Sequence, residues 1–254
     1  MITILLCAGY ATRMHPLTKD FPKPLLPVAG KPVLDYFMAQ LMDIDGEHDV
    51  HVVTNERFAP HFKAWRKDWM KRRVSKFTEI TVHNDGSTDN DNRLGACRDM
   101  AWAFEKIENF THALVAAGDN IFRFSLAPLW EEFAGADSHR IVVLPESNPE
   151  KLQQTGVPRF GTADRVLRLY EKPEHPPTDW SCPAIYFLKG SAGPILDRFL
   201  QTSGNKDAPG HFIDYLCQNS KVCAFKVRSS RFDIGSIDDY HSADRRLRGE
   251  PVFM

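Results

Sequence analysis

Residues 5–32 read LLCAGYATRMHPLTKDFPKPLLPVAGKP, and the rest of the chain can be interpreted outward from this stretch. The apolar run over residues 2–7 predicts one buried strand, which ends at an Ala-Gly pair. A polar loop containing Arg13 follows, then a proline-flanked lysine, Lys23, and a helical pattern that begins near Pro32. A strand, a turn of small residues and fixed cations together present backbone N–H groups and positive charge, which is how proteins bind phosphate chains.

The composition limits the classes of protein to which the chain can belong. It has 254 residues, of which 43% are hydrophobic, and a net charge of −1 with an isoelectric point near 6.8. No overall field attracts nucleic acid or an anionic membrane, so we expect neither as a partner. The five cysteines are scattered without a C-x-x-C pair, which predicts neither a zinc site nor a disulfide framework. Since no stretch resembles a signal peptide or a membrane span, we expect a soluble, cytoplasmic protein.

Strand-like and helix-like patterns alternate through the first half of the chain, which predicts a mostly parallel sheet with right-handed crossovers. Residues 158–172 are typical of a hairpin, and the aromatic stripe of the helix over residues 57–73 is predicted to face the core rather than nucleic acid. The predicted strands are residues 2–7, 50–54, 79–83, 112–117, 140–144, 184–188, 222–227 and 231–234. The predicted helices are residues 32–42, 57–73, 94–107, 193–200, 212–218 and 237–247.

The opening stretch resembles the signature of the sugar-1-phosphate nucleotidyltransferases, L-A-x-G-x-G-T-R-[LM]-x-P-L-T followed by P-K-P. Residues 6–18 and 22–24 carry the match, and Ala11 departs from it where a glycine is usual. Because alanine tolerates positive φ poorly, either the loop bends differently or the nucleotide phosphates are shifted. Further ordered blocks resemble the family: Leu94-Gly95-Ala96, Gly118-Asp119-Asn120, Glu171-Lys172-Pro173, and residues 231–240 against W-x-D-[IV]-G-T-x-x-x-Y.

This resemblance implies an α/β fold, a Rossmann-like three-layer sandwich with a mostly parallel mixed sheet and an added sugar-binding hairpin region. We expect one nucleotidyltransferase domain over residues 1–254, with a nucleotide-binding half to about residue 135 and a sugar-binding half from about residue 136. The chain ends soon after the block at 231–240, so we expect no left-handed β-helix or acetyltransferase domain.

The resemblance also implies a reaction, in which an NTP and a sugar 1-phosphate give an NDP-sugar and pyrophosphate with Mg²⁺ as cofactor. Arg13 and Lys23 are the implied catalytic cations, and Asp119 and Asp233 the implied magnesium ligands. The implied nucleotide-binding residues are Leu6, Ala8, Gly9, Tyr10, Ala11, Thr12, Asn84 and Gly95. The implied sugar-phosphate-binding residues are Gly161, Glu171 and Lys172.

The substrates stay open at this point. The Gly-Asp-Asn-Ile-Phe segment is most similar to thymidylyl and uridylyl relatives, which favours dTTP or UTP over CTP or GTP. Other acceptors in related proteins are phosphocholine, heptose phosphate and N-acetylmuramate phosphate. A catalytically silent relative that binds a nucleotide-sugar is favoured by Ala11 but opposed by the intact cations and aspartates. Relatives are often dimers or tetramers, so a homo-oligomer is also compatible with the sequence.

Overall fold

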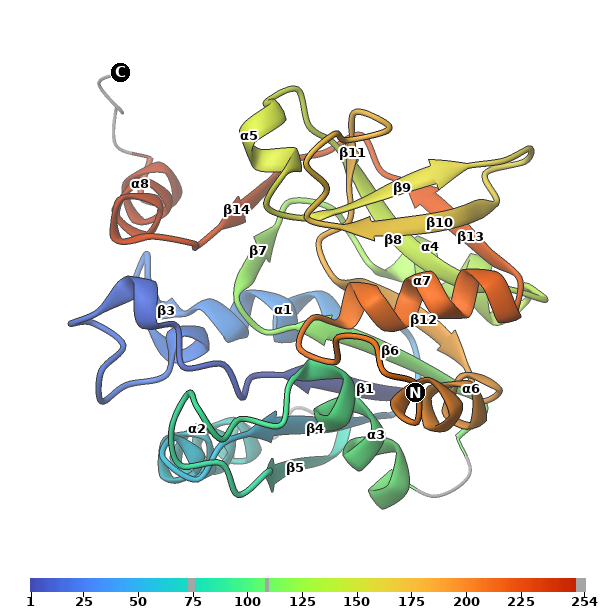
Figure 1. Ribbon diagram of the computed structural model, residues 1–254. Coiled ribbons are helices and arrows are strands. Elements are labelled where there is room, and N and C mark those ends of the chain that lie inside the picture. Colours follow the sequence, from blue (N-terminus) through green and yellow to red (C-terminus); the bar gives the residue numbers. More distant parts are fainter. Residues whose placement is uncertain (73–75, 108–109, 250–254) are drawn as a thin grey trace.

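The computed structural model describes residues 1–72, 76–107 and 110–249, and it is built around a mixed sheet with helices on both faces (Figure 1). The eight-stranded sheet has the order β11-β8-β12-β6-β1-β4-β5, and β13 pairs with β8 beside that path. The predicted α/β class with a mixed sheet is therefore confirmed. None of the described helices is long and apolar enough to cross a bilayer.

Four strands from the first half of the chain are parallel, which follows from the helices that connect them. β1 (Ile2–Leu6) lies between β6 (His112–Ala117) and β4 (His48–Thr54), and β5 (Phe77–Asn84) pairs with the outer side of β4. The segments that leave these strands share one edge of the sheet, as predicted. This edge is where open α/β sheets bind ligands.

The second half of the chain extends the same sheet with strands of both directions. β12 (Ile185–Lys189) is antiparallel to both β6 and β8 (His139–Pro145), whereas β13 (Val222–Lys226) is parallel to β8. The short β11 (Trp180–Ser181) closes the edge against β8. The sheet is thus continuous across the two predicted halves.

Successive side chains of β1 point to opposite faces, and each face carries its own apolar core. Leu5 packs in a core that includes Phe37, Phe62 and Phe133, whereas Ile4 packs in a second core on the other face. Helices α1, α2 and α4 therefore cover one face, and α3, α6 and α7 cover the other. The helices are α1 (Val33–Met42), α2 (Ala59–Lys71), α3 (Ala96–Ile107), α4 (Ala127–Ala134), α5 (Pro149–Leu152), α6 (Ala192–Leu200), α7 (Pro209–Asn219) and α8 (Ile237–Leu247).

The aromatic stripe of α2 faces the core, which confirms that prediction. Trp65 and Trp69 are buried, and both indole Nε1 groups donate to Asp35 Oδ1 at 2.7 Å. Two donors from one helix therefore satisfy a buried carboxylate on α1. The predicted last residue of this helix, Arg73, lies outside the described residues.

Short strand pairs lie outside the main sheet. β9 (Gly156–Phe160) and β10 (Val166–Glu171) form the predicted hairpin. β14 (Arg231–Asp233) pairs antiparallel with β7 (Asn120–Phe122) and leads into α8, as Figure 1 shows. A third pair, β2 (Pro27–Val28) with β3 (Lys31–Pro32), precedes α1.

The sequence did not predict β7 or α4, and it began α3 two residues early. Gly95, at φ +86°, ends the extended segment so that the helix begins at Ala96. β7 and α4 are too short for a clear apolar period. Their stability comes from packing, as with the fully buried Phe133 against Phe187.

The turn after β6 is packed tightly against the start of the loop that follows β1. Gly118 N donates to Leu6 O at 3.2 Å, and a Cβ at Gly118 would overlap Cys7 Sγ and approach Leu34 Cδ1 at 3.3 Å. Cys7 is buried, in accord with its interpretation as an apolar filler, and burial raises the pKa of its thiol well above the ordinary value. This contact fixes Gly118 beside the β1 loop, so the neighbouring Asp119 follows from a rigid turn.

We expect Gly118→Ala to lower the free energy of unfolding by about 1–3 kcal/mol, because the new methyl overlaps a buried sulfur. Urea denaturation measures this loss. Gly135→Ala is the matched control, because a Cβ there meets nothing within 4 Å. Adding Cys7→Ala should restore part of the stability, and an unchanged double variant would contradict the packing explanation.

Candidate active site

The loop after β1 is held by the segments that follow β4 and β5. Asn55 Nδ2 donates to Ala8 O at 2.9 Å, and the Tyr10 hydroxyl donates to Ser87 O at 2.9 Å. Because both braces come from the same edge of the sheet, the loop has a defined shape before any ligand binds. Of the residues predicted to bind nucleotide here, Gly9 and Thr12 are exposed, Leu6 and Ala11 are half-buried, and Ala8 and Tyr10 are buried.

Ala11 adopts the left-handed conformation that a glycine would favour, with φ 46° and ψ 43°. Its carbonyl oxygen accepts hydrogen bonds from Thr18 Oγ1 at 2.8 Å and from Met14 N at 2.9 Å. These two bonds hold the turn, although the Cβ makes this conformation unfavourable. The loop therefore keeps the glycine-type bend in spite of the substitution.

Lys23 connects three segments that are far apart in the sequence. Its buried ammonium lies 2.6 Å from Asp119 Oδ2 and donates to Ile234 O at 2.6 Å. Burial by itself would raise the pKa of Asp119, but the Lys23 ammonium and more weakly Arg231 hold it below its usual value. Asp119 is therefore an anion at neutral pH and compensates the buried lysine.

The pairing of β14 with β7 brings the two predicted metal-binding aspartates to the same edge. Asp233 is opposite Asn120, and Asn120 directly follows Asp119 in the chain. The oxygen Asn120 Oδ1 is buried without a hydrogen-bond donor among the described residues, while its amide donates to Asp119 Oδ1 at 2.8 Å. Two carboxylates and an amide oxygen are hard oxygen donors, and this set fits Mg²⁺. The described residues contain no group of three or more His, Cys, Asp or Glu that could hold a metal.

A cavity of about 510 Å³ brings together side chains from the three main predicted blocks. Arg13 comes from the loop after β1, Lys172 from the end of the hairpin, and Asp233 from β14. Lys172 has φ 50°, an unfavourable conformation for a residue with a Cβ, and its N–H donates to Thr155 O at 3.0 Å. The lining also includes Arg231 and Arg246, so cations exceed carboxylates and the cavity suits a polyanion.

Glu171 lies on the other side of the hairpin end, facing the start of α7. A Cβ at Gly210 would overlap Glu171 Oε2, and one at Gly156 would approach the same oxygen at 3.5 Å. Burial raises the pKa of Glu171, whereas Lys172 and His211 oppose this shift. The carboxyl therefore occupies a narrow site between two glycine backbones.

Gly161, which we predicted to bind the sugar phosphate together with Glu171, does not lie opposite Glu171 in the hairpin. Gly161 lies in the hairpin turn, where its N–H donates to Arg165 O at 2.7 Å. The residue opposite Glu171 in the strand register is Gly156. The sequence offers one glycine at the start of this strand and another directly after its end, and only the register shows which of them lies opposite Glu171.

The predicted base-binding elements lie on the other side of the β1 loop. Asn84 ends β5, and its amide is engaged locally: it donates to Glu56 Oε2 and accepts from Gly86 N at 3.0 Å. Gly95 has no room for a side chain, because a Cβ would approach Lys206 O at 2.9 Å. Ala96 N also donates to Asp207 O, so the Leu-Gly-Ala turn packs on the loop that precedes α7.

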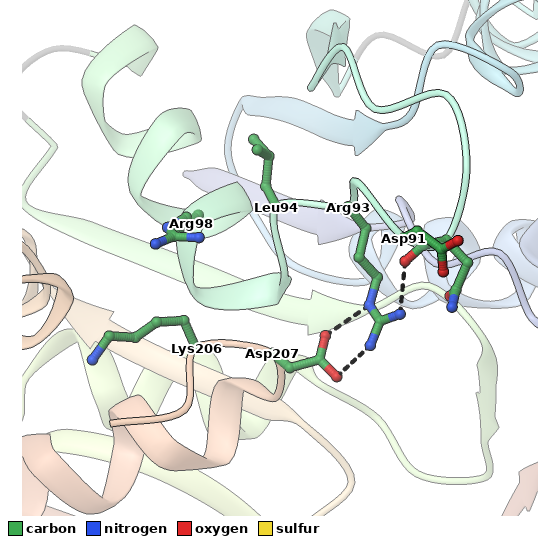
Figure 2. A pocket seen from close by; sticks show the side chains of 7 residues that line it. Asp91, Arg93, Leu94, Arg98, Lys206 and Asp207 are labelled. Carbon is green, nitrogen blue, oxygen red and sulfur yellow. Dashed lines mark hydrogen bonds and ion pairs between the residues drawn. The ribbon is translucent and has the colours of Figure 1, made fainter. Parts of the chain in front are cut away.

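Figure 2 shows the outer side of this turn, a shallow cavity of about 450 Å³. Arg93 makes a bidentate pair with Asp207, with Nε–Oδ1 and Nη2–Oδ2 distances of 2.9 and 2.8 Å. Arg98 from α3 and Lys206 from the loop also line this cavity, and the Lys206 ammonium turns away from the pair to donate to Phe199 O and Thr202 Oγ1 at 2.7 Å. The ion pair thus fastens the acidic loop after β5 to the segment before α7.

Two carboxyls, Asp85 and Asp99, face each other beneath this loop. Ser87 N and Ser87 Oγ both donate to Asp85 Oδ1 at 2.7 Å, but Asp85 Oδ2 and Asp99 Oδ1 are buried without a donor among the described residues. Burial, and then the negative charge of Asp85, raise the pKa of Asp99 to about 8. A proton on Asp99 that is shared with Asp85 gives both of these oxygens a partner at neutral pH.

The sequence interpretation did not single out Arg231, Gly156, Asn120 or the Asp85–Asp99 pair. Asn120 stood beside a predicted ligand, and this position could have indicated it. The others carry no recognisable local signal, because their roles depend on strand pairing and on contacts between distant segments.

Comparison with known proteins identifies the class to which this fold and site belong. The profile of the family described as Nucleotidyl transferase matches residues 2–250, so the chain belongs to this family. The resemblance to the sugar-1-phosphate nucleotidyltransferases is therefore confirmed at the level of the family.

The chain is 27% identical over 248 residues to the bifunctional protein GlmU of Methanocaldococcus jannaschii, and the match covers 97% of this chain and 54% of that protein. It is 29% identical over 194 residues to a glucose-1-phosphate thymidylyltransferase of Neisseria meningitidis, with 74% of this chain and 62% of the relative covered. A solved UDP-glucose pyrophosphorylase complexed with UDP-glucose has the same fold, with a TM-score of 0.81 at 19% identity over 98% of each chain. The chain spans between half and two thirds of these two curated relatives.

Replacing Ala11 by glycine should stabilise the protein by up to about 1 kcal/mol, because the left-handed cost of alanine exceeds the extra unfolded-state entropy of glycine. The midpoint of urea unfolding measures the change. Ala134→Gly, at the exposed end of α4, should instead destabilise by roughly 0.5–1 kcal/mol. Equal losses in the two variants would contradict the strain assigned to Ala11.

Asp99 should make stability fall as the pH rises from about 4 to about 8. In this range the folded state keeps a proton that an unfolded aspartate has released, and the state with more bound protons loses stability as pH rises. Urea denaturation at about pH 5 and about pH 8 should show that the free energy of unfolding declines less between these pH values for Asp99→Asn than for the wild type. Asp197→Asn, an exposed carboxylate on α6, should keep the wild-type decline. Identical profiles for the wild type and Asp99→Asn would rule out the shared proton.

Proposed function

We propose that this chain condenses an NTP with a sugar 1-phosphate to give an NDP-sugar and pyrophosphate. The observation that carries this proposal is the cavity lined by Arg13, Lys172 and Asp233, with the Lys23–Asp119 pair at the adjacent strand end. One side of this arrangement can hold a triphosphate and the other a phosphorylated acceptor. Membership of the nucleotidyl transferase family supports the same reaction class.

The cations divide the two phosphate groups between them. Arg13 binds the β- and γ-phosphates, for which its planar fork is suited, and Lys172 binds the acceptor's phosphate. Lys23 is assigned to the α-phosphate: two of its three N–H groups have partners among the described residues, which leaves one N–H for this contact. Holding both reactants in line removes most of the entropic cost of their encounter.

The acceptor needs no general base, because a sugar phosphate is already anionic at neutral pH. Its phosphate oxygen attacks the α-phosphorus of the NTP, the new P–O bond forms, and the bond to the departing pyrophosphate breaks. Asp119 and Asp233 would hold Mg²⁺, which when bound neutralises charge on the phosphate oxygens. Charged side chains already directed at the α-phosphate require little reorganisation during this step.

Glu171 and the two glycines beside it favour a polyhydroxylated acceptor. A carboxylate accepts hydrogen bonds from sugar hydroxyls, and the bare backbones of Gly156 and Gly210 leave room for this carboxylate at the end of the hairpin. Phosphocholine has no hydroxyls for this carboxylate to bind, so we favour a sugar. dTTP or UTP is the favoured nucleotide, with Gly95 and Asn84 beside the base.

A matrix of NTPs against sugar phosphates tests this function directly. Pyrophosphate release in Mg²⁺ is assayed with dTTP, UTP, CTP and GTP. Each NTP is paired in turn with a hexose phosphate, a heptose phosphate, N-acetylmuramate phosphate and phosphocholine. We expect release with at least one sugar 1-phosphate. The absence of release with every pair, together with nucleotide-sugar binding, would indicate a catalytically silent relative instead.

Substituting Lys23→Met or Asp233→Asn should reduce turnover on the order of a hundredfold, because each removes charge stabilisation from the transferred phosphate. Steady-state kinetics with the active pair measures the effect. The thermal stability of the Lys23 variant must also be measured, because loss of the lysine leaves Asp119 without the cation that pairs with it. Asp197→Asn serves as the charge-matched control. Full turnover in both site variants would refute the assigned roles.

A further inference from the structure

Arg231 is a cation of the cavity wall that the roles above leave unused. It comes from β14, and its side chain is only 16% exposed. Residues two apart on a strand point to the same face, so Arg231 and Asp233 project together into the cavity that they both line. The Arg231 Nη2–Asp233 Oδ2 distance is 3.4 Å.

This ion pair is loose by comparison with the other arginine–aspartate pairs of the protein. Arg168 binds Asp214 with two bonds of 2.7 and 2.9 Å, and Arg93 binds Asp207 with two bonds of similar length. Charge-assisted bonds normally have such lengths. Arg231 has given up most of its water, yet within the described part of the chain Asp233 is its only ion-pair partner. Its guanidinium therefore has donors directed into the cavity that an anion would satisfy.

The charge of Arg231 acts on both sides of the cavity. On one side, its strand β14 pairs with β7, which begins directly after Asp119, so Arg231 lies near the strand end at which Asp119 contacts Lys23. It also opposes the rise that burial causes in the pKa of Cys182, whose N–H donates to Gly156 O of the hairpin. Arg231 thus lies where the nucleotide side and the hairpin side meet, which is where the acceptor's phosphate must be held.

We propose that Arg231 is a ligand of the acceptor's phosphate, and that Asp233 holds its guanidinium in the cavity until the ligand binds. This inference rests on the proposed function. Lys172 supplies a point charge to the same phosphate, whereas the planar fork of Arg231 binds two of its oxygens and so fixes its orientation for in-line attack. When the guanidinium turns to phosphate, the carboxylate of Asp233 becomes free for its own role.

The proposal makes two predictions of opposite sign for Arg231→Gln. The affinity for a phosphorylated ligand should fall, because two charge-assisted bonds are lost. The affinity of the protein alone for Mn²⁺, a spectroscopic substitute for Mg²⁺, should stay the same or rise, because Asp233 loses its competing cation. A merely structural role, in which Arg231 supports β14 and Asp233, would weaken both.

Calorimetric titrations with glucose 1-phosphate and with inorganic phosphate, both in Mg²⁺, measure the first effect, and electron paramagnetic resonance with Mn²⁺ measures the second. Arg231→Gln should bind phosphate roughly tenfold or more weakly, and Arg231→Lys should lie between it and the wild type. Arg228→Gln removes the same charge from an exposed position three residues earlier and outside the cavity, so it should bind phosphate like the wild type.

Unchanged phosphate affinity in Arg231→Gln would overturn the proposal, as would a parallel loss of Mn²⁺ affinity or a wild type that binds neither phosphate probe. Failure of the proposed function is a separate observation, since it would appear as no pyrophosphate release by the wild type. A wild type that releases pyrophosphate, with an Arg231→Gln variant that binds phosphate normally, would remove only the role of Arg231.

Discussion

The buried ammonium of Lys23 is the interaction on which the rest of the site depends. A lysine with 9% exposure is stable only if its charge is compensated, and Asp119 Oδ2 and Ile234 O provide this at 2.6 Å each. These partners belong to the turn after β6 and to the segment after β14. A single charge therefore holds the proline-flanked segment after the β1 loop, the end of a central strand and the entry to the last helix in one arrangement. Removing either charge leaves the other buried and unpaired, which is why the contact constrains the fold as well as the chemistry.

The site is a set of charges that already compensate one another. Lys23 pairs with Asp119 and Arg231 pairs with Asp233, so each predicted metal-binding carboxylate has a cation beside it. On the proposed function, ligand binding would exchange partners: the carboxylates would turn to a metal and the cations to phosphate, with little net change in buried charge. The polar groups are thus kept in position without their ligands, and this preorganisation lowers the cost of the reacting geometry.

The order of the strands determines which segments can meet here. β1 and β6 are neighbours, so the loop after one lies beside the turn after the other, and Gly118 against Cys7 fixes their separation. The antiparallel pairing of β14 with β7 then adds Asp233 from near the end of the chain. Asp244 of α8 accepts from Ala29 N at 2.7 Å, which ties the last helix to the segment that carries Lys23. Distant blocks of sequence converge because backbone hydrogen bonds and a few buried charges align them.

The sequence by itself determined most of the main elements and indicated the residues to which the proposed chemistry is assigned. Apolar period and capping predicted β6 and α8 with their observed bounds. The family motifs indicated Arg13, Lys23 and the aspartates Asp119 and Asp233. Both kinds of signal could be read because each lies in contiguous residues. Only the tertiary structure showed that the two aspartates come to the same edge of the sheet, and which glycine lies opposite Glu171. Only the structure also showed that the amide of Asn84 donates to Glu56 and that Ala11 keeps a left-handed turn. It also brought Asp85 next to Asp99 and placed Arg231 in a long ion pair with Asp233. Register, burial and charge compensation depend on contacts between residues far apart in the chain, and no local pattern of residues encodes them.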